Sequence, residues 1–139
     1  MNKTERERPN WDVYGMSLAY AARLRSPDPH YQVGACALRQ DRSVAATGYN
    51  GAPAGVEIDW TDRIKRRGKV IHAEKNCLRY TKRGEVHYLY CTLSPCAKCF
   101  EMIRLHGVKE IIFSEIYEMD MTALAIAPSH NIICRQLKI

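Results

Sequence analysis

Three side chains that could bind a metal occur at two places in the sequence, and a carboxylate accompanies one of them. His72 is followed two residues later by Glu74, and a Cys-x-x-Cys pair, Cys96 and Cys99, comes further along the chain. Imidazole and thiolate are common zinc ligands, and three protein ligands leave the fourth tetrahedral position open, as in catalytic zinc sites. The spacing therefore predicts a catalytic zinc site formed by His72, Cys96 and Cys99.

The carboxylate could carry protons for such a site. Glu74 stands two residues from His72, within reach of a water molecule on the metal, and it is not needed as a ligand. Zinc lowers the pKa of a coordinated water to about 7, and a neighbouring carboxylate can act as general acid and base. We therefore expect hydrolysis at an amidine-like carbon, with Glu74 as the catalytic residue.

Two other interpretations of the cysteines are open at this point. A Cys-x-x-Cys pair also occurs in thioredoxin-type redox proteins, but that interpretation leaves the histidine and the glutamate without a role. A closed structural zinc site would need a fourth ligand, and the nearest candidates are Cys77, Cys91 and His87. Cys77 and Cys91 lie in apolar periodic segments, which favours core packing, and Cys36 and Cys134 receive the same interpretation.

Predicted helices begin next to each ligand group. Residues 72–84 have helical periodicity, and Ser94 can cap a helix that reaches His106. A helix N-terminus stabilises a thiolate, the form of cysteine that binds zinc. Further helices are expected over 11–24, after an Asn10 cap, and over 115–127, with strands over 32–38, 43–49, 86–92, 108–113 and 131–137.

The order of these elements predicts an α/β fold. A short connection between the first two strands is typical of an antiparallel hairpin, whereas the alternation of strands and helices from residue 72 onward predicts parallel strands. We expect a single domain over residues 1–139, with three α-β-α layers and a central mixed sheet of about five strands. The basic run at 63–69 lacks periodicity, so we predict a solvated loop there.

Composition limits the class of protein. The chain has 139 residues, of which 46% are apolar, and this is enough for one core. The formal net charge of +6 favours anionic partners such as nucleotides. No apolar stretch approaches the ~18 residues of a membrane helix, and the first residues lack the apolar core of an export signal, so we expect a soluble, cytoplasmic protein.

The motifs of the sequence resemble those of a known family. His-x-Glu followed by Pro-Cys-x-x-Cys is similar to the signature of the zinc-dependent cytidine and deoxycytidylate deaminases. The similarity covers most of the chain and includes Gln-Val-Gly-Ala at 32–35, Gly-Tyr-Asn-Gly at 48–51 and His-Ala-Glu-Lys-Asn at 72–76. The resemblance implies a cytidine-deaminase-like fold, one catalytic zinc ion per chain and hydrolysis of dCMP to dUMP and ammonia, with Glu74 as the proton shuttle.

The resemblance also implies contacts with the substrate. A turn-forming role is the alternative for Asn50, and core packing is the alternative for Tyr117. The implied contacts are Ala73 and Ser94 at the pyrimidine, Asn50 at the nucleotide, Arg25 and Ser26 at the phosphate, and Tyr117 at the rim of the site.

Regulation and assembly are implied in the same way. Family members form hexamers in which dCTP activates and dTTP inhibits, so a homo-oligomer with these effectors is expected here. Two features depart from the family pattern, because Cys77 stands where a small residue is common and the chain after Tyr117 matches poorly. The implied effector-binding segment consists of Gly48, Tyr49, Asn50 and Gly51.

Two rival functions are weighed against this one. A deaminase of nucleic acid such as tRNA could use the same zinc core together with the basic run at 63–69, but that run contains no aromatic residue on which bases could stack. A non-catalytic module that binds zinc and nucleotides is disfavoured, because the three metal ligands and the proton-carrying glutamate are all present. These four residues are His72, Glu74, Cys96 and Cys99. Free dCMP is therefore the favoured substrate, with CMP as the open alternative.

Overall fold

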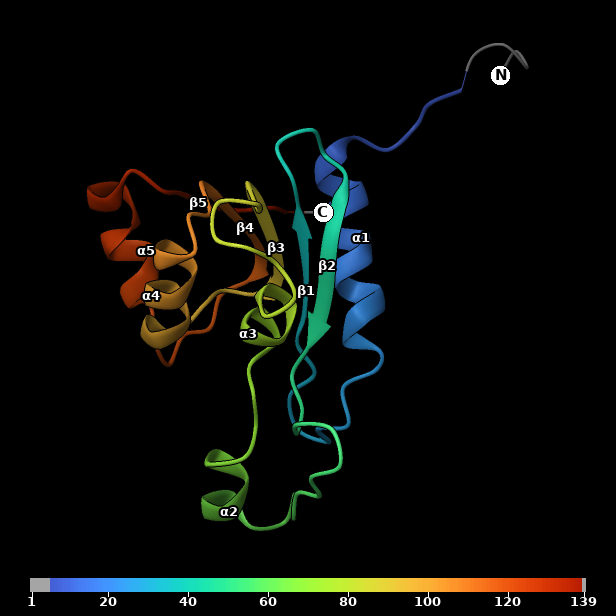
Figure 1. Cartoon of the computed structure of the whole chain (residues 1–139), viewed down its shortest axis with the longest axis vertical. Coiled ribbons are helices and arrows are strands. Elements are labelled where there is room, and N and C mark those ends of the chain that lie inside the picture. Colours follow the sequence, from blue (N-terminus) through green and yellow to red (C-terminus); the bar gives the residue numbers. More distant parts are fainter. Residues whose placement is uncertain (1–5, 139) are drawn as a thin grey trace.

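A single mixed sheet forms the centre of the molecule in the computed structural model, which describes residues 6–138 (Figure 1). Its strand order is β2-β1-β3-β4-β5. The predicted α/β fold with about five strands is confirmed. The strands are β1 (Gly34–Leu38), β2 (Val44–Tyr49), β3 (Tyr88–Leu93), β4 (Glu110–Glu115) and β5 (Ile133–Gln136).

Strand directions follow the two halves of the sequence. Strand β1 pairs antiparallel with β2 and with β3, whereas β3, β4 and β5 are parallel to one another. The predicted hairpin and the predicted parallel strands are both confirmed. Because parallel neighbours need crossover connections, the chain leaves β3 through helix α4 (Ala97–Leu105) and returns along β4.

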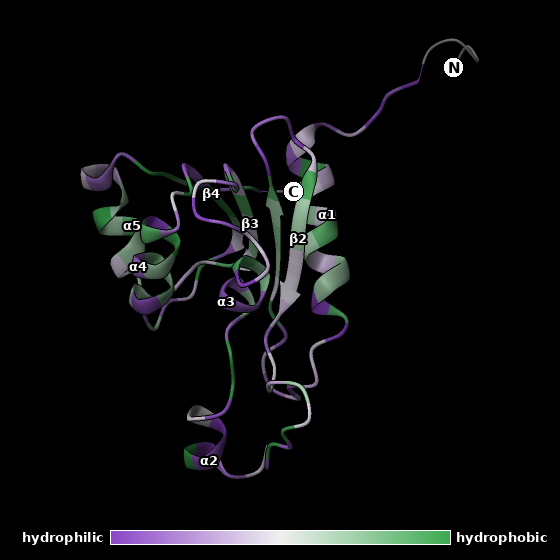
Figure 2. Cartoon of the chain, in the orientation of Figure 1, coloured by the Kyte–Doolittle hydropathy of each residue, from purple (hydrophilic) through white to green (hydrophobic). Residues whose placement is uncertain are grey.

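Helices cover both faces of the sheet (Figure 1). On one face, helix α1 (Trp11–Arg23) buries Met16 and Ala19 against Cys36, Tyr90 and Ile112 of the strands. The other face is covered by α3 (Ala73–Leu78), α4 and α5 (Thr122–Ile126). Figure 2 shows hydrophobic residues recurring in the sheet and helices, while the β1–β2 connection is hydrophilic. The three layers are therefore held together by apolar burial.

Asn10 begins the first helix as predicted. Its side-chain Oδ1 accepts a hydrogen bond from the backbone N–H of Val13 at 2.9 Å. This contact satisfies one of the N–H groups that a helix leaves free at its start.

The basic run at 63–69 is not a loop, which corrects the prediction. Helix α2 spans Arg63–Arg67, and the Asp62 side chain caps it by accepting from the N–H groups of Ile64 and Lys65. A short helix gives too few turns for an apolar period to appear, so only the capping aspartate marked it. None of the helices within residues 6–138 combines the length and apolarity needed to cross a membrane.

Three predicted helices differ in their ends. The helix after His72 stops at Leu78 rather than near residue 84, and the N-cap position of α4 is Cys96 rather than Ser94. Only part of 115–127 is helical, because α5 begins at Thr122 and a 3-10 turn, Ala127–His130, follows it. Pro128 lies in that turn and prevents α5 from continuing as a regular helix.

Candidate active site

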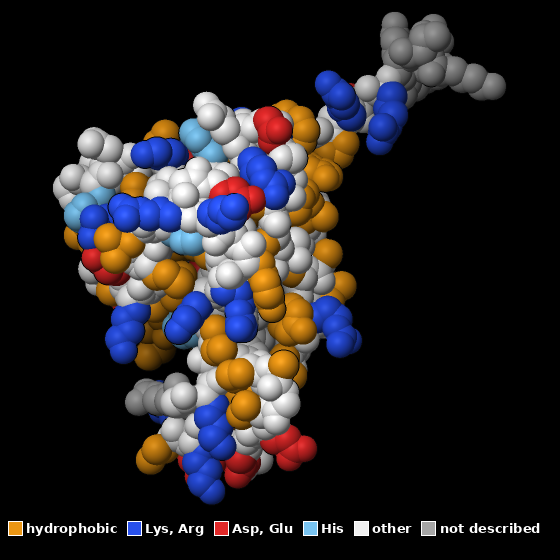
Figure 3. Space-filling model, viewed as in Figure 1, with side chains coloured by type: hydrophobic (Ala, Val, Ile, Leu, Met, Phe, Trp, Pro, Cys, Tyr) orange, Lys and Arg blue, Asp and Glu red, His pale blue; other side chains and the backbone are white. Residues whose placement is uncertain are grey.

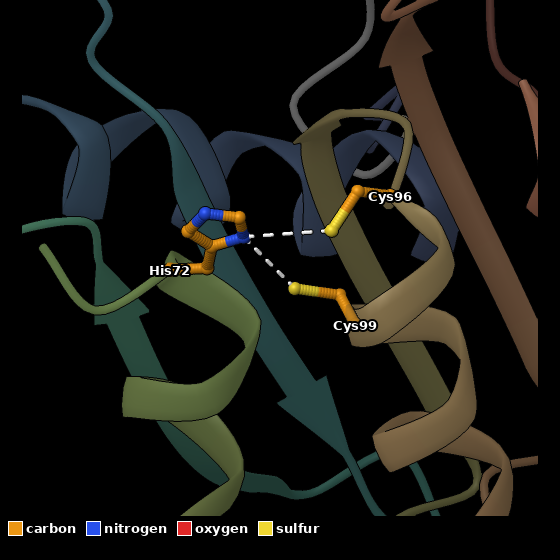
Figure 4. A group of neighbouring side chains, drawn as sticks. All are labelled: His72, Cys96 and Cys99. Atoms are coloured by element: carbon orange, nitrogen blue, oxygen red, sulfur yellow. Dashed lines mark hydrogen bonds between the residues drawn. The ribbon is translucent and has the colours of Figure 1, made fainter. Parts of the chain in front are cut away.

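The three predicted metal ligands come together where two helices begin. His72 directly precedes α3, while Cys96 and Cys99 occupy the N-cap and the first turn of α4. The Nδ1 atom of His72 lies 3.0 Å from Sγ of Cys99 and 3.7 Å from Sγ of Cys96. Figure 4 shows the imidazole and the two sulfur atoms facing one another. The starts of α3 and α4 therefore bring the three ligand atoms into one cluster.

This donor set fits a single zinc ion. The three ligand atoms all lie within 4.8 Å of one another. Zinc bonds of about 2.0–2.3 Å in tetrahedral geometry separate ligand atoms by about 3.6 Å, which is comparable with the spacing here. Within the described part of the chain, no fourth His, Cys, Asp or Glu belongs to the group. Cys77 and Cys91 are instead buried in the core, as the apolar pattern around them predicted.

Hydrogen bonds among the three side chains shift their pKa values. Hydrogen bonds from the Cys99 thiol and from His72 lower the pKa of Cys96 to about 4. The hydrogen bond to the Cys96 sulfur in turn raises the pKa of Cys99 and that of His72. Cys96 is therefore the more acidic of the two cysteines. A divalent cation bound by the three side chains would replace the protons that they share.

Glu74 lies beside the cluster and is buried. It is the second residue of α3, and only 4% of its surface is exposed. Burial raises the pKa of its carboxyl group. A carboxyl group that is easily protonated at this position can both take up and release a proton. The side chain thus has the environment of a general acid and base.

A cavity of about 230 Å³ opens next to His72 and Glu74. Tyr117, for which core packing was the alternative, reaches this cavity, and its N–H donates to Oγ of Ser94 at 2.8 Å. That bond ties the end of β3 to the segment after β4. Four of the six residues predicted at the substrate line the cavity, namely Asn50, Ala73, Ser94 and Tyr117.

The other two predicted substrate residues lie outside it. Neither Arg25 nor Ser26 is among the described residues that line the cavity. Arg25 is exposed beyond the end of α1. The Ser26 Oγ donates to the backbone oxygen of Asn50 at 2.9 Å and lies 2.7 Å from its Oδ1. Ser26 therefore holds Asn50 in place without lining the cavity itself.

Protein groups contact the Asn50 amide at both its oxygen and its nitrogen. Its Oδ1 accepts from Ser26 and from the N–H of Val33, the latter at 2.8 Å. Its Nδ2 donates to the Tyr31 carbonyl at 2.8 Å and, at 3.4 Å, to a carboxylate oxygen of Asp28. The single proton of the Ser26 hydroxyl is shared between this Oδ1 and the backbone oxygen of Asn50. Asn50 thus fastens the segment before β1 to the end of β2.

The predicted effector segment packs tightly at the end of β2. A Cβ atom on Gly48 would lie 2.4 Å from the backbone nitrogen of Cys77, so only glycine lets α3 approach the strand. Gly51 exchanges two backbone hydrogen bonds with Ile71, the residue before His72. Tyr49 keeps 37% of its surface exposed. This segment therefore helps to position the start of α3.

Two acidic residues near the site received no role from the sequence. Asp28 lines the cavity, but it stands between two prolines in a segment for which the sequence predicts no role. Asp120 accepts a hydrogen bond from the first N–H of α4. A Ser or Asp that precedes an apolar helix signals a cap only when it is close in sequence, and Asp120 is not.

A second hollow of about 610 Å³ is lined in part by His72 and Cys99. It is lined by Lys69, Lys75 and Lys98, and none of the described residues around it is Asp or Glu. Figure 3 shows Lys and Arg side chains over α2 and the adjoining part of the molecule. These three lysines therefore lie outside the cavity that Glu74 lines.

The sequence matches a known protein family over most of its length. Residues 9–115 match the family model described as the cytidine and deoxycytidylate deaminase zinc-binding region. A deoxycytidylate deaminase of Mycobacterium phage D29 is 35% identical over 123 residues, which cover 76% of this chain and 95% of that protein. The human deoxycytidylate deaminase is 34% identical over 113 residues, covering 74% of this chain and 64% of the human protein.

The chain covers only part of its cellular relatives, whereas its fold matches a solved structure over nearly the whole chain. The chain spans 64% of the human protein and 45% of the deoxycytidylate deaminase of Saccharomyces cerevisiae, to which it is 34% identical. A crystal structure of dCMP deaminase from the cyanophage S-TIM5 superimposes with a TM-score of 0.77. The two are 24% identical, and the match covers 94% of this chain and 100% of that one. This likeness shows the fold.

Proposed function

Because the chain belongs to the cytidine and deoxycytidylate deaminase family, we propose that it is a hydrolase that converts dCMP and water to dUMP and ammonia. One observation carries the proposal. Two members of the ligand cluster that fits zinc, His72 and Cys96, line the same cavity as the buried carboxyl group of Glu74. This is the combination of parts that hydrolysis at the amidine-like C4 of a cytosine requires.

His72, Cys96 and Cys99 would hold the zinc ion, which supplies Lewis-acid activation of the attacking water. Glu74 takes one proton from that water and passes it to N3 of the ring while the water oxygen bonds to C4. Glu74 then takes the remaining proton from the oxygen bonded to C4 and passes it to the exocyclic amine. The bond between that nitrogen and C4 breaks, and ammonia leaves. The carboxyl group ends the cycle as it began.

The remaining cavity residues orient the base. The backbone of Ala73 and the Ser94 region are proposed to contact the pyrimidine edge, with Tyr117 at the rim. The Ser94 hydroxyl accepts from the Tyr117 N–H, so these two parts of the wall are linked to one another. A rigid wall of this kind keeps C4 in line with the attacking oxygen.

Regulation and assembly are proposals that rest on family membership. We expect dCTP to activate and dTTP to inhibit in a hexameric, cytoplasmic protein, with Gly48, Tyr49, Asn50 and Gly51 at the effector. The exposed edge of β2 and the partly exposed Tyr49 support contact with another subunit there. Light scattering with and without dCTP measures the assembly directly, and a monomer in both conditions would contradict it.

The substrate class is tested with the zinc-loaded protein. Ammonia release and product formation are followed with dCMP, CMP, deoxycytidine, dCTP and a tRNA anticodon stem-loop. We expect dCMP to have the highest kcat/KM. Reaction of the stem-loop alone would overturn the proposal and assign the lysine-lined hollow to nucleic acid. Release of ammonia from none of them by a protein that binds one zinc ion per chain would favour a non-catalytic module.

A further inference from the structure

The connection between α3 and β3 carries an exposed aromatic ring among cations. Residues 79–83, the 79–83 loop, have the sequence Arg-Tyr-Thr-Lys-Arg, and only the threonine is partly buried. Tyr80 keeps 75% of its surface exposed, more than any other Phe, Tyr or Trp in the described part of the chain. Lys and Arg side chains gather on the face that carries this connection (Figures 1 and 3). Neither the core nor the candidate active site accounts for these exposed side chains.

Hydrogen bonds to the end of α4 hold this loop in place. The Thr81 hydroxyl donates to the Leu78 carbonyl at 2.7 Å and lies 2.7 Å from Nε2 of His106. The N–H of Gly84 donates to the backbone oxygen of His106 at 2.9 Å. Gly84 has a φ of +85°, a conformation that favours glycine. The backbone is therefore fixed on both sides of the exposed cations, and a surface ordered in advance loses less entropy on binding.

The positive charge of the loop is not offset by a neighbouring acid. Glu85 is the only Asp or Glu among residues 75–100. Its carboxylate forms an ion pair with Arg39 at 2.8 Å and accepts the backbone N–H of Lys82 at 2.9 Å. The ion pairs within residues 6–138 include none of the three cations of the loop. These cations therefore attract an anionic partner.

The aromatic ring narrows the kind of anion. Cζ of Arg79 lies 5.3 Å from the centroid of the Tyr80 ring, and most of the tyrosine still faces solvent. Proteins that bind single strands without sequence preference stack bases on aromatic rings and contact the backbone with cations. The basic run at 63–69 offers charge but no aromatic residue, whereas the 79–83 loop offers both. A duplex fits less well, because its bases are already stacked on one another.

We propose that the 79–83 loop binds single-stranded nucleic acid. An unpaired base stacks on Tyr80, and neighbouring phosphates contact Lys82 and Arg83. None of these three residues lines the cavity beside Glu74 or the lysine-lined hollow, so the strand is bound at a separate surface and is not the substrate. This binding goes beyond the proposed deamination of dCMP and does not depend on it.

The test measures the fluorescence anisotropy of a labelled oligothymidylate at several salt concentrations. Tyr80→Ala should weaken binding by on the order of tenfold. Tyr80→Phe should keep the wild-type affinity, because stacking uses the ring and not the hydroxyl. Lys82→Ala and Arg83→Ala should each reduce the slope of log affinity against log salt by about 0.7, the value for one phosphate contact with a single strand. Thermal unfolding of each variant checks that the fold is intact.

Tyr14→Ala and Arg63→Ala are the matched controls. Tyr14 is an exposed tyrosine on α1, across the sheet from the 79–83 loop, and Arg63 is an exposed cation of α2. Both variants should bind like the wild type. A loss in Arg63→Ala with none in Tyr80→Ala would assign the binding to α2 and overturn the proposal. Equal affinity for a duplex, or no binding to the single strand at low salt, would overturn it as well.

Discussion

The carboxylate of Asp120 accepts a hydrogen bond from the backbone N–H of Ala97 at 2.8 Å, although the two residues are 23 positions apart. Ala97 is the first residue of α4, whose N-cap Cys96 makes no side-chain capping bond. Asp120 therefore caps this helix from a distant segment. Because Cys96 and Cys99 lie in the same turn, the cap also orients two of the three ligands of the cluster.

Replacing Asp120 by alanine should loosen the ligand cluster. We expect Asp120→Ala to lower the free energy of unfolding by about 1 kcal/mol, the usual cost of a lost helix cap. The zinc affinity should fall as well, by about tenfold, because the ligands are held less firmly. Chelator competition and urea unfolding measure the two effects. Glu118→Ala, at an exposed acidic position nearby, should change neither. An unchanged zinc affinity in Asp120→Ala would limit its role to stability.

Glu74→Gln should separate proton transfer from metal binding. The amide has almost the same shape as the carboxyl group but cannot carry a proton between water and base. We expect kcat on dCMP to fall by at least about 10³-fold, while metal analysis still finds one zinc ion per chain. The exposed Glu101→Gln serves as control. If Glu74→Gln loses its zinc, the glutamate is a ligand and the assignment is wrong.

Metal removal should weaken the fold as well as the activity. Folding energy and metal binding are coupled when the ligands come from separate elements. We expect a chelator, or Cys96→Ala, to abolish activity and to lower the midpoint of thermal unfolding. Cys134→Ala provides the comparison, since Cys134 is a free cysteine outside the cluster. Full zinc content in Cys96→Ala would exclude Cys96 as a ligand.

A bidentate ion pair joins the first turn of α1 to the last strand. Nη1 and Nη2 of Arg135 each lie 2.9 Å from an oxygen of Asp12, and the Tyr90 hydroxyl donates to the same carboxylate. The Arg135 hydrogen bonds lower the pKa of Asp12, against an opposing effect of burial. A carboxyl group with a lowered pKa stabilises the fold above its unfolded pKa, and this contribution is lost as pH falls through the folded value.

Asp12→Asn should therefore destabilise the protein in a pH-dependent way. At pH ~7 we expect a loss of about 1 kcal/mol in the free energy of unfolding. The difference from wild type should shrink as the pH falls from the unfolded pKa, about 4, through the lower pKa of the folded carboxylate. Urea unfolding across this range measures it, with Glu118→Gln as control. A difference that stays constant with pH would show that charge is not the cause.

Local sequence patterns determined most of the secondary structure and the metal ligands. Asn10 caps its helix as the residue type predicts, and the hairpin of β1 and β2 follows from adjacent apolar stretches. His72, Cys96 and Cys99 were recognisable because zinc chemistry restricts both the residue types and their spacing. Patterns of this kind span only a few neighbouring residues, so they can be recognised from the sequence alone.

The tertiary structure alone decided which polar groups meet. Asp28 resembles a turn residue in the sequence, and Asp120 stands in a segment without a clear pattern. Their roles arise from contacts with Asn50 and Ala97, each more than 20 residues away. The same holds for Ser26, which supports Asn50 and does not reach the cavity. A hydrogen bond depends on distances of a few ångströms, and only the packing of helices on the sheet sets these.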